Sequence, residues 1–171
     1  MIIDDKPDEG SRDEIARPEP PRTFLCVVDD SDEVRQALRF ACRRAHHTGG
    51  RVALLYVIEP AEFQHWMAVG QLMADERREE AEEMLQVVAS VVKQRSGRTP
   101  VIYIREGKLT DELMKLIREE PDISVLVLGA DTAQEGPGRL ISHVVKSIGK
   151  LPIPVTIVPG GLSDEQIDGI S

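Results

Sequence analysis

Short, almost continuous apolar runs alternate along the chain with longer segments in which apolar residues recur every three or four positions. Runs of four to eight apolar residues have the length of buried strands, and the longer segments have the period of amphipathic helices. The predicted strands are 23–29, 51–58, 100–104, 123–128 and 155–158. The predicted helices are 34–47, 75–93, 110–117 and 140–148.

This alternation predicts an α/β fold, with an open, Rossmann-like sheet of five mostly parallel strands and helices on both faces. The last strand, 155–158, is expected at an edge of the sheet. The carboxyl ends of parallel strands meet at one rim, which is where such folds bind ligands. The residues expected on that rim are Asp29, Glu59, Glu106 and Gly129.

The two ends of the chain differ in composition from the middle. Residues 1–22 are rich in Asp, Glu, Arg and Pro and predict a disordered tail, because they bury too little apolar surface to offset their ordering entropy. The domain is expected over 23–159, and the polar residues 160–171 predict a frayed C-terminal tail. The mixed segment 61–74 around Trp66 predicts a loop or short helix, either packed on the sheet or acting as a ligand lid or partner surface.

Composition excludes several classes of protein. The chain has 171 residues, 41% of them hydrophobic, and a formal net charge of -9, which argues against a nucleic-acid binder and against docking on an anionic membrane. No apolar run approaches the ~20 residues of a membrane span, and the N-terminus does not resemble a signal peptide. A cytoplasmic location is therefore expected.

Candidate catalytic and metal-binding chemistry is sparse. The histidines do not have the spacing of metal ligands with a cysteine or carboxylate, and no nucleophile is spaced with a base. We therefore predict no metal site, no catalytic residue and no enzymatic activity. Cys26 and Cys42 fall at interior positions and are expected to be buried thiols.

The richest feature is the junction after the fourth predicted strand. The apolar run that begins at Ser124 ends in Gly129, and a glycine-containing loop and an amphipathic helix follow it. Backbone N–H groups and a helix N-terminus converge at such a junction, which makes it suited to an anion or a nucleotide.

Several stretches in the same order resemble the universal stress protein family over roughly 23–159. They are Val28-Asp29-Asp30-Ser31 at the end of the first strand, Leu55-Tyr56-Val57-Ile58-Glu59-Pro60 at the second, Gly107 before the third helix, Leu128-Gly129 and Pro152-Ile153-Pro154-Val155. The resemblance implies a stress-response protein that binds rather than catalyses.

A two-component receiver domain is the weaker resemblance. Its first strand also ends in an acidic pair, as here at Asp29-Asp30, but the family implies an Asp after the third strand and a Lys after the fifth. The chain has Arg105-Glu106-Gly107 and Val158-Pro159-Gly160 at these places.

In nucleotide-binding universal stress proteins, the resemblance implies a phosphate motif of Gly, two residues, Gly, nine residues, Gly, and then Ser or Thr. The first position is Gly129, the second is Thr132, and the last two fall on Ile141 and Ser142 after a gap that is one residue short. Gly138 offers close backbone approach by another route. The motif is therefore degenerate.

The same resemblance places Asp29 against a ribose or base and Val57 against an adenine. The ligand it implies is an adenine nucleotide, ATP or AMP, with Mg²⁺ if the ligand is ATP. Two structural alternatives stay open, since Asp29 can act as a helix-cap acid and the Ser142 hydroxyl can bond within its own helix. Asp131 would repel a polyphosphate, and Arg139 would compensate.

The last strand also resembles the strand through which this family pairs across a two-fold axis. We therefore predict a homodimer through Val155, Thr156, Ile157 and Val158. Two functions remain open at this point. One is a regulator that responds to an adenine nucleotide, and the other is a ligand-free dimeric module that binds an unknown protein partner.

Overall fold

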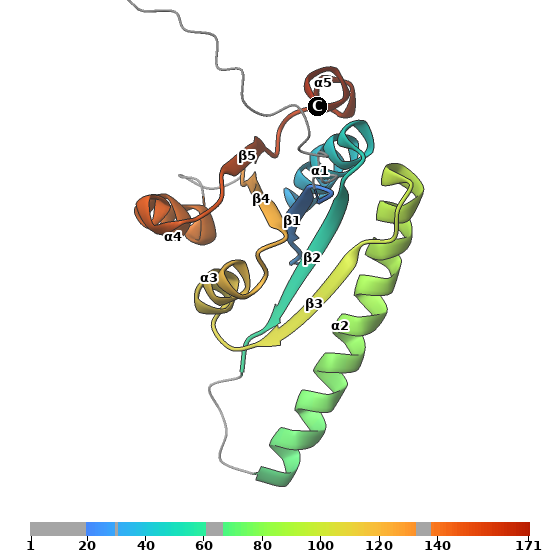
Figure 1. Ribbon diagram of the computed structural model, residues 1–171. Helices are drawn as coiled ribbons and strands as arrows, with labels where there is room; N and C mark the ends of the chain where they lie inside the picture. The colour runs from blue at the N-terminus through green and yellow to red at the C-terminus, as the bar shows by residue number, and fades with distance from the viewer. Residues whose placement is uncertain (1–19, 30, 61–66, 133–137) are drawn as a thin grey trace, which may run out of the picture.

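The computed structural model describes residues 20–29, 31–60, 67–132 and 138–171, with backbone alone for 67–73. Within them lies a sheet of five parallel strands in the order β3-β2-β1-β4-β5 (Figure 1). The predicted α/β fold is confirmed, and β5 is an edge strand as expected. The strands are β1 (Thr23–Val27), β2 (Arg51–Ile58), β3 (Val101–Glu106), β4 (Ile123–Ala130) and β5 (Val155–Pro159). The helices are α1 (Val34–Thr48), α2 (Met67–Ser96), α3 (Leu109–Glu119), α4 (Arg139–Lys146), the 3-10 turn η1 (Ile148–Lys150) and α5 (Asp164–Ile170).

Helices cover the sheet on both faces, because β1 alternates its side chains between two cores. Phe24 and Cys26 pack with α1 and α2 on one face, whereas Leu25 and Val27 pack with α3 and α4 on the other. All four side chains are buried. This two-sided burial explains why the strand is an unbroken apolar run in the sequence.

Helix α1 packs across the middle of the sheet, against β1, β2, β4 and β5, and its residues explain why. It presents small side chains at helical spacing, Ala37, Ala41 and Ala45, all of which are buried. Gly49 ends the helix in the left-handed conformation with φ 64°, which favours glycine. Glu33 occupies the N-cap position of α1 and makes no side-chain cap bond there.

Helix α2 is longer than predicted. It begins at Met67 and runs for 30 residues, so the prediction of a loop or short helix is wrong for residues 67–74. Good helix formers dominate these positions, and the single Gly70 does not interrupt them. Residues 61–66, including Trp66, lie outside the described residues, as do residues 1–19 of the predicted tail.

The prediction of a frayed tail for 160–171 is also wrong, because residues 164–170 form α5. Ser163 and Gln166 form a capping box at its start, and Ile167 is completely buried. The acidic residues that made this segment look like a tail are partners of arginines on α1. Arg39 donates to the Asp168 carboxylate at 2.8 and 2.6 Å.

The hydrogen bonds from Arg39 lower the pKa of Asp168 below its usual range. A carboxylate whose pKa is lowered by folding stabilises the native state above its unfolded pKa. That contribution is lost only as the pH falls through the lowered value, so the pairing of α5 with α1 persists at neutral pH.

Both cysteines are free and buried, as predicted. Burial raises the pKa of Cys42 to about 11 and raises that of Cys26 further. Because the thiolate is the reactive form, we expect neither thiol to react appreciably with a disulfide reagent in the native protein at pH 7.5, and both to react after denaturation. Rapid native modification of either thiol would contradict the buried placement.

Candidate functional site

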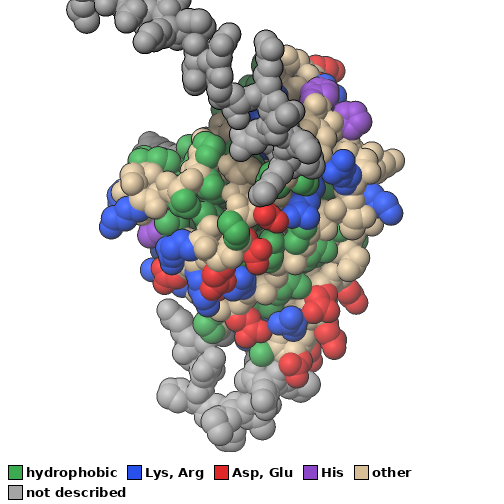
Figure 2. All heavy atoms as spheres, viewed as in Figure 1, with side chains coloured by type: hydrophobic (Ala, Val, Ile, Leu, Met, Phe, Trp, Pro, Cys, Tyr) green, Lys and Arg blue, Asp and Glu red, His purple; other side chains and the backbone are tan. Residues whose placement is uncertain are grey.

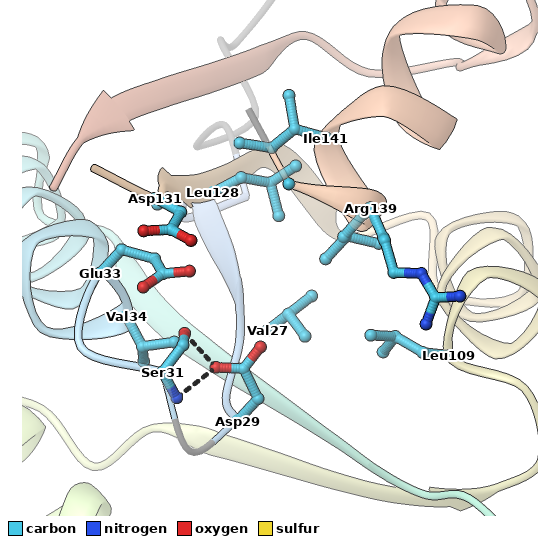
Figure 3. Close-up of a pocket in the computed structure, with 13 residues that line it drawn as sticks. Val27, Asp29, Ser31, Glu33, Val34, Leu109, Leu128, Asp131, Arg139 and Ile141 are labelled. Carbon is cyan, nitrogen blue, oxygen red and sulfur yellow. Dashed lines mark hydrogen bonds between the residues drawn. The ribbon is translucent and has the colours of Figure 1, made fainter. Parts of the chain in front are cut away.

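A cleft of about 250 Å³ opens at the carboxyl ends of β1 and β4 (Figure 3). The chain leaves β1 toward β2 on one side and reaches β4 on the other, so this is the switch point where open α/β sheets bind ligands. The described residues that line the cleft are Val27, Asp29, Ser31, Glu33, Val34, Leu109, Leu128, Gly129, Asp131, Gly138, Arg139, Leu140 and Ile141.

The wall beside α1 is built from the turn that follows β1. The Asp29 carboxylate accepts a hydrogen bond from the Ser31 backbone N–H at 3.0 Å and another from the Ser31 hydroxyl. Asp29 therefore fixes its own turn and does not cap α1, whose N-cap position is Glu33. Its side chain is also exposed toward the cleft, so its other oxygen can still accept from a ligand hydroxyl (Figure 3).

Gly129 lies where β4 meets this wall. A Cβ atom on Gly129 would stand 2.3 Å from the carbonyl oxygen of Glu33 and 2.7 Å from its carbonyl carbon. Only a residue without a side chain allows the start of α1 to pack so closely on β4. Gly129 thus has a structural reason to be glycine that needs no ligand.

The opposite wall is formed by α3 and by the start of α4. Gly138 has a φ of 84°, and the exposed side chain of Arg139 follows it. Ile141 is only 3% exposed and packs with Val144 in the core. The position that the phosphate motif reserves for its third glycine is therefore occupied by a core side chain.

The charges in the cleft are unequal. The carboxylates of Asp29, Glu33 and Asp131 lie toward the α1 side, and the guanidinium of Arg139 lies across from them (Figure 3). Arg139 is the only cation among the described residues that line the cleft. Such a site has one group suited to a single phosphate and three that oppose a polyphosphate.

The structure brings together half of the predicted nucleotide residues. Asp29, Gly129 and Gly138 line the cleft, whereas Thr132 is exposed beside it. Val57 is half-buried and packs in the core below α3.

The Ser142 hydroxyl donates to the carbonyl of Gly138 at 2.8 Å, which is the bond within its own helix that the sequence left open. Sequence reasoning missed Glu33, Val34 and Leu109 as wall residues. The sequence held one weak signal for them. Glu33 and Val34 follow closely after the rim acid Asp29, and Leu109 follows closely after Gly107.

Two further classes of site were searched for in the part of the chain that the structure describes. No group of three or more His, Cys, Asp or Glu side chains there could hold a metal ion. Among the described helices, none combines the length and the apolar character needed to cross a bilayer.

The predicted dimer edge is partly uncovered. Val155 and Thr156 are half-buried, Val158 is buried, and Ile157 is 41% exposed. Nearby on α4 and η1, Val145 and Ile148 are each 51% exposed. Figure 2 shows hydrophobic side chains gathered over α4 and β5 on this face.

Residues 21–159 match the model of the Universal stress protein family. No curated protein is a significant match to the chain. Among solved structures, UspA from Lactobacillus plantarum is 22% identical, with 80% of this chain and 97% of that chain covered and a TM-score of 0.67.

Two other similar structures hold nucleotides. A universal stress protein from Archaeoglobus fulgidus in complex with dAMP is 21% identical, covering 80% of this chain and 96% of that chain, with a TM-score of 0.55. A universal stress protein family protein from Arabidopsis thaliana with AMP bound is 14% identical, covering 85% and 95%, with a TM-score of 0.58. At these identities the likeness shows the fold.

Proposed function

Because this chain belongs to the universal stress protein family, we propose that it is a non-enzymatic stress-response protein whose cleft between β1 and β4 binds an adenine nucleoside monophosphate. The observation that carries this proposal is Arg139, the one cation among the described lining residues, placed across the cleft from three carboxylates. Similar structures with AMP or dAMP bound support the ligand class.

The cleft favours a monophosphate over ATP for reasons of space and charge. Its volume of about 250 Å³ lies just below the usual range of small-molecule sites. Arg139 can pair with one phosphate, but additional phosphates would meet Glu33 or Asp131 unless a cation such as Mg²⁺ separated them. Ile141 also excludes the close backbone approach that a phosphate chain needs.

A thermal-shift and calorimetric series with adenosine, AMP, ADP and ATP, with and without Mg²⁺, tests the proposal. AMP at a hundred times its Kd should add about 2.7 kcal/mol to the free energy of unfolding. For a chain of this length that raises Tm by roughly 5 to 10 °C. If no nucleotide at millimolar concentration moves Tm, the cleft is not a nucleotide site.

Replacing Arg139 by glutamine should weaken AMP binding roughly tenfold to a hundredfold, because a charge-assisted bond to the phosphate is lost. Adenosine, which has no phosphate, should bind both proteins equally. Lys146→Gln is the matched control, since it removes one positive charge from the exposed face of the same helix and should change the AMP affinity less than about twofold. Equal AMP affinities for wild type and Arg139→Gln would contradict the proposed phosphate position.

The second part of the proposal is a homodimer formed through β5. The uncovered edge and the exposed apolar side chains of Ile157, Val145 and Ile148 support it, since edge strands are usually paired or protected.

A ligand-free dimeric module for a protein partner is the alternative function. The observation that favours it is the burial of Ile141 at the motif's third glycine position.

A further inference from the structure

Helix α5 lies beyond the part of the chain that matches the family model, which ends at residue 159. It packs beside α1 at one side of the molecule (Figure 1). A helix of seven residues is not stable alone in water, so its order depends on the contacts it makes.

The contacts between α5 and α1 combine one apolar anchor with an ionic network. Ile167 is fully buried and belongs to the core between α1 and the sheet. Arg39 binds both oxygens of Asp168 and also reaches Asp164 at 2.9 Å. Arg43 donates to the backbone carbonyl of Asp168 at 3.0 Å. These contacts hold α5 along the outer side of α1.

The connector between β5 and α5, residues 160–163, reaches the rear of the cleft. The Gly160 N–H donates to the carbonyl of Ala130 at 2.9 Å, and a Cβ on Gly160 would stand 3.1 Å from the Cβ of Glu33. A Cβ on Gly161 would contact the methyl group of Thr132 at 3.4 Å.

Next along the chain, the Gln36 amide of α1 donates to the carbonyl of Leu162 at 2.5 Å. The connector therefore passes close to Glu33, which lines the cleft, and is hydrogen-bonded to the first turn of α1 through Gln36.

We propose that α5 is a brace that positions the α1 wall of the cleft, which is lined by Asp29, Ser31, Glu33 and Val34, with Arg39 and Ile167 as its main positioning residues. Glu33 lies close to Gly129 on the side of β4 and close to Gly160 on the side of the connector. Releasing α5 frees the connector at Leu162, where Gln36 of α1 is bonded to it, so the wall loosens. The consequence for binding rests on the proposed function, but the coupling itself is a property of the ligand-free protein.

The opposite wall of the cleft, at the start of α3, serves as an internal control for the effect of α5. There the Leu109 N–H donates to the Glu59 carboxylate at 3.1 Å at the start of α3. The α5 contacts described above all lie on the α1 side, so loss of the brace should leave α3 unchanged.

Hydrogen exchange measured by mass spectrometry on the ligand-free full chain tests the brace. In Arg39→Gln and in Ile167→Ala, we expect the amides of 31–37 and of α5 to exchange at least about tenfold faster than in wild type. The amides of α3 should keep their wild-type rates.

Arg35→Gln is the matched control. It removes the same charge one turn earlier on α1, from a side chain that is 70% exposed and pairs with Asp164 at 3.4 Å. Exposed pairs of this kind contribute little, so exchange at the cleft wall should not change.

Faster exchange confined to α5, with wild-type rates at 31–37, would overturn the proposal. If Ile167→Ala speeds exchange throughout β1 and β4, the fold itself has loosened, and Arg39→Gln and Asp168→Asn then decide, since they remove no core atoms. AMP titration of the same variants is a separate measurement. If wild type binds no AMP while the wall still responds to α5, the proposed function fails and the brace stands.

Discussion

An alanine at Gly129 is expected to lower the free energy of unfolding by about 3 kcal/mol, because it overpacks a junction that has no free space. The added Cβ would stand 2.3 Å from the carbonyl oxygen of Glu33, and this atom belongs to the backbone rather than to a flexible side chain. Relief therefore requires the whole start of α1 to move away from β4. The small residues of α1, such as Ala37 and Ala41, would then lose contact with the sheet.

Thermal unfolding followed by circular dichroism measures this effect, and Tm should fall by roughly 6 to 12 °C. Gly149→Ala is the control, because no atom lies within 4 Å of a Cβ there and its φ is not in the left-handed region. That change should stay within about 0.5 kcal/mol of wild type. If Gly129→Ala were equally neutral, the glycine would have no structural role, and a ligand would be the better explanation for it.

A lysine at Ile157 is expected to weaken the proposed homodimer on the order of 100-fold, equivalent to about 2.7 kcal/mol. Ile157 shares a strand face with Val155, which packs in the core with α4, so its exposed side chain lies at the apolar surface of the β5 edge. Two-fold pairing through β5 would bring this position close to the axis and bury the two lysines there without partners.

Sedimentation velocity over a concentration series measures the dimer affinity. Val87→Lys is the control, since Val87 is 68% exposed on α2, away from β5 (Figure 1), and its replacement should leave the affinity unchanged. Monomeric wild type at micromolar concentration would remove the dimer proposal altogether. An unchanged dimer in Ile157→Lys would show instead that the chain associates through another surface.

Those parts of the site that come directly from strand ends could be predicted from the sequence. Asp29 and Gly129 each end an apolar run, and parallel strands bring their carboxyl ends to one rim, so both residues were expected there and both line the cleft. Val57 lies within β2, one residue before its end, and whether its side chain turns toward the cleft or the core depends on the helix packed over it. The structure places it in the core.

The helix ends and the C-terminal segment were harder to predict. Residues 160–171 are polar, and polarity alone does not distinguish a solvated tail from a helix whose acids pair with a neighbour. The difference lies in Arg39, 125 or more positions away from Asp164 and Asp168 in the sequence. The sequence of residues 160–171 alone does not indicate an ion-pair partner so many positions away along the chain.

The sequence by itself therefore determined the five strands, the α/β fold and the rim, because burial on both faces leaves a local apolar pattern. The family was indicated separately, by the resemblance of short motifs at the strand ends. Tertiary structure alone decided three things: that Ile141 fills the core, that Gly129 admits the backbone of Glu33, and that α5 is ordered against α1. Each of these depends on which distant atoms come within contact distance, and that is set by the packing of whole elements.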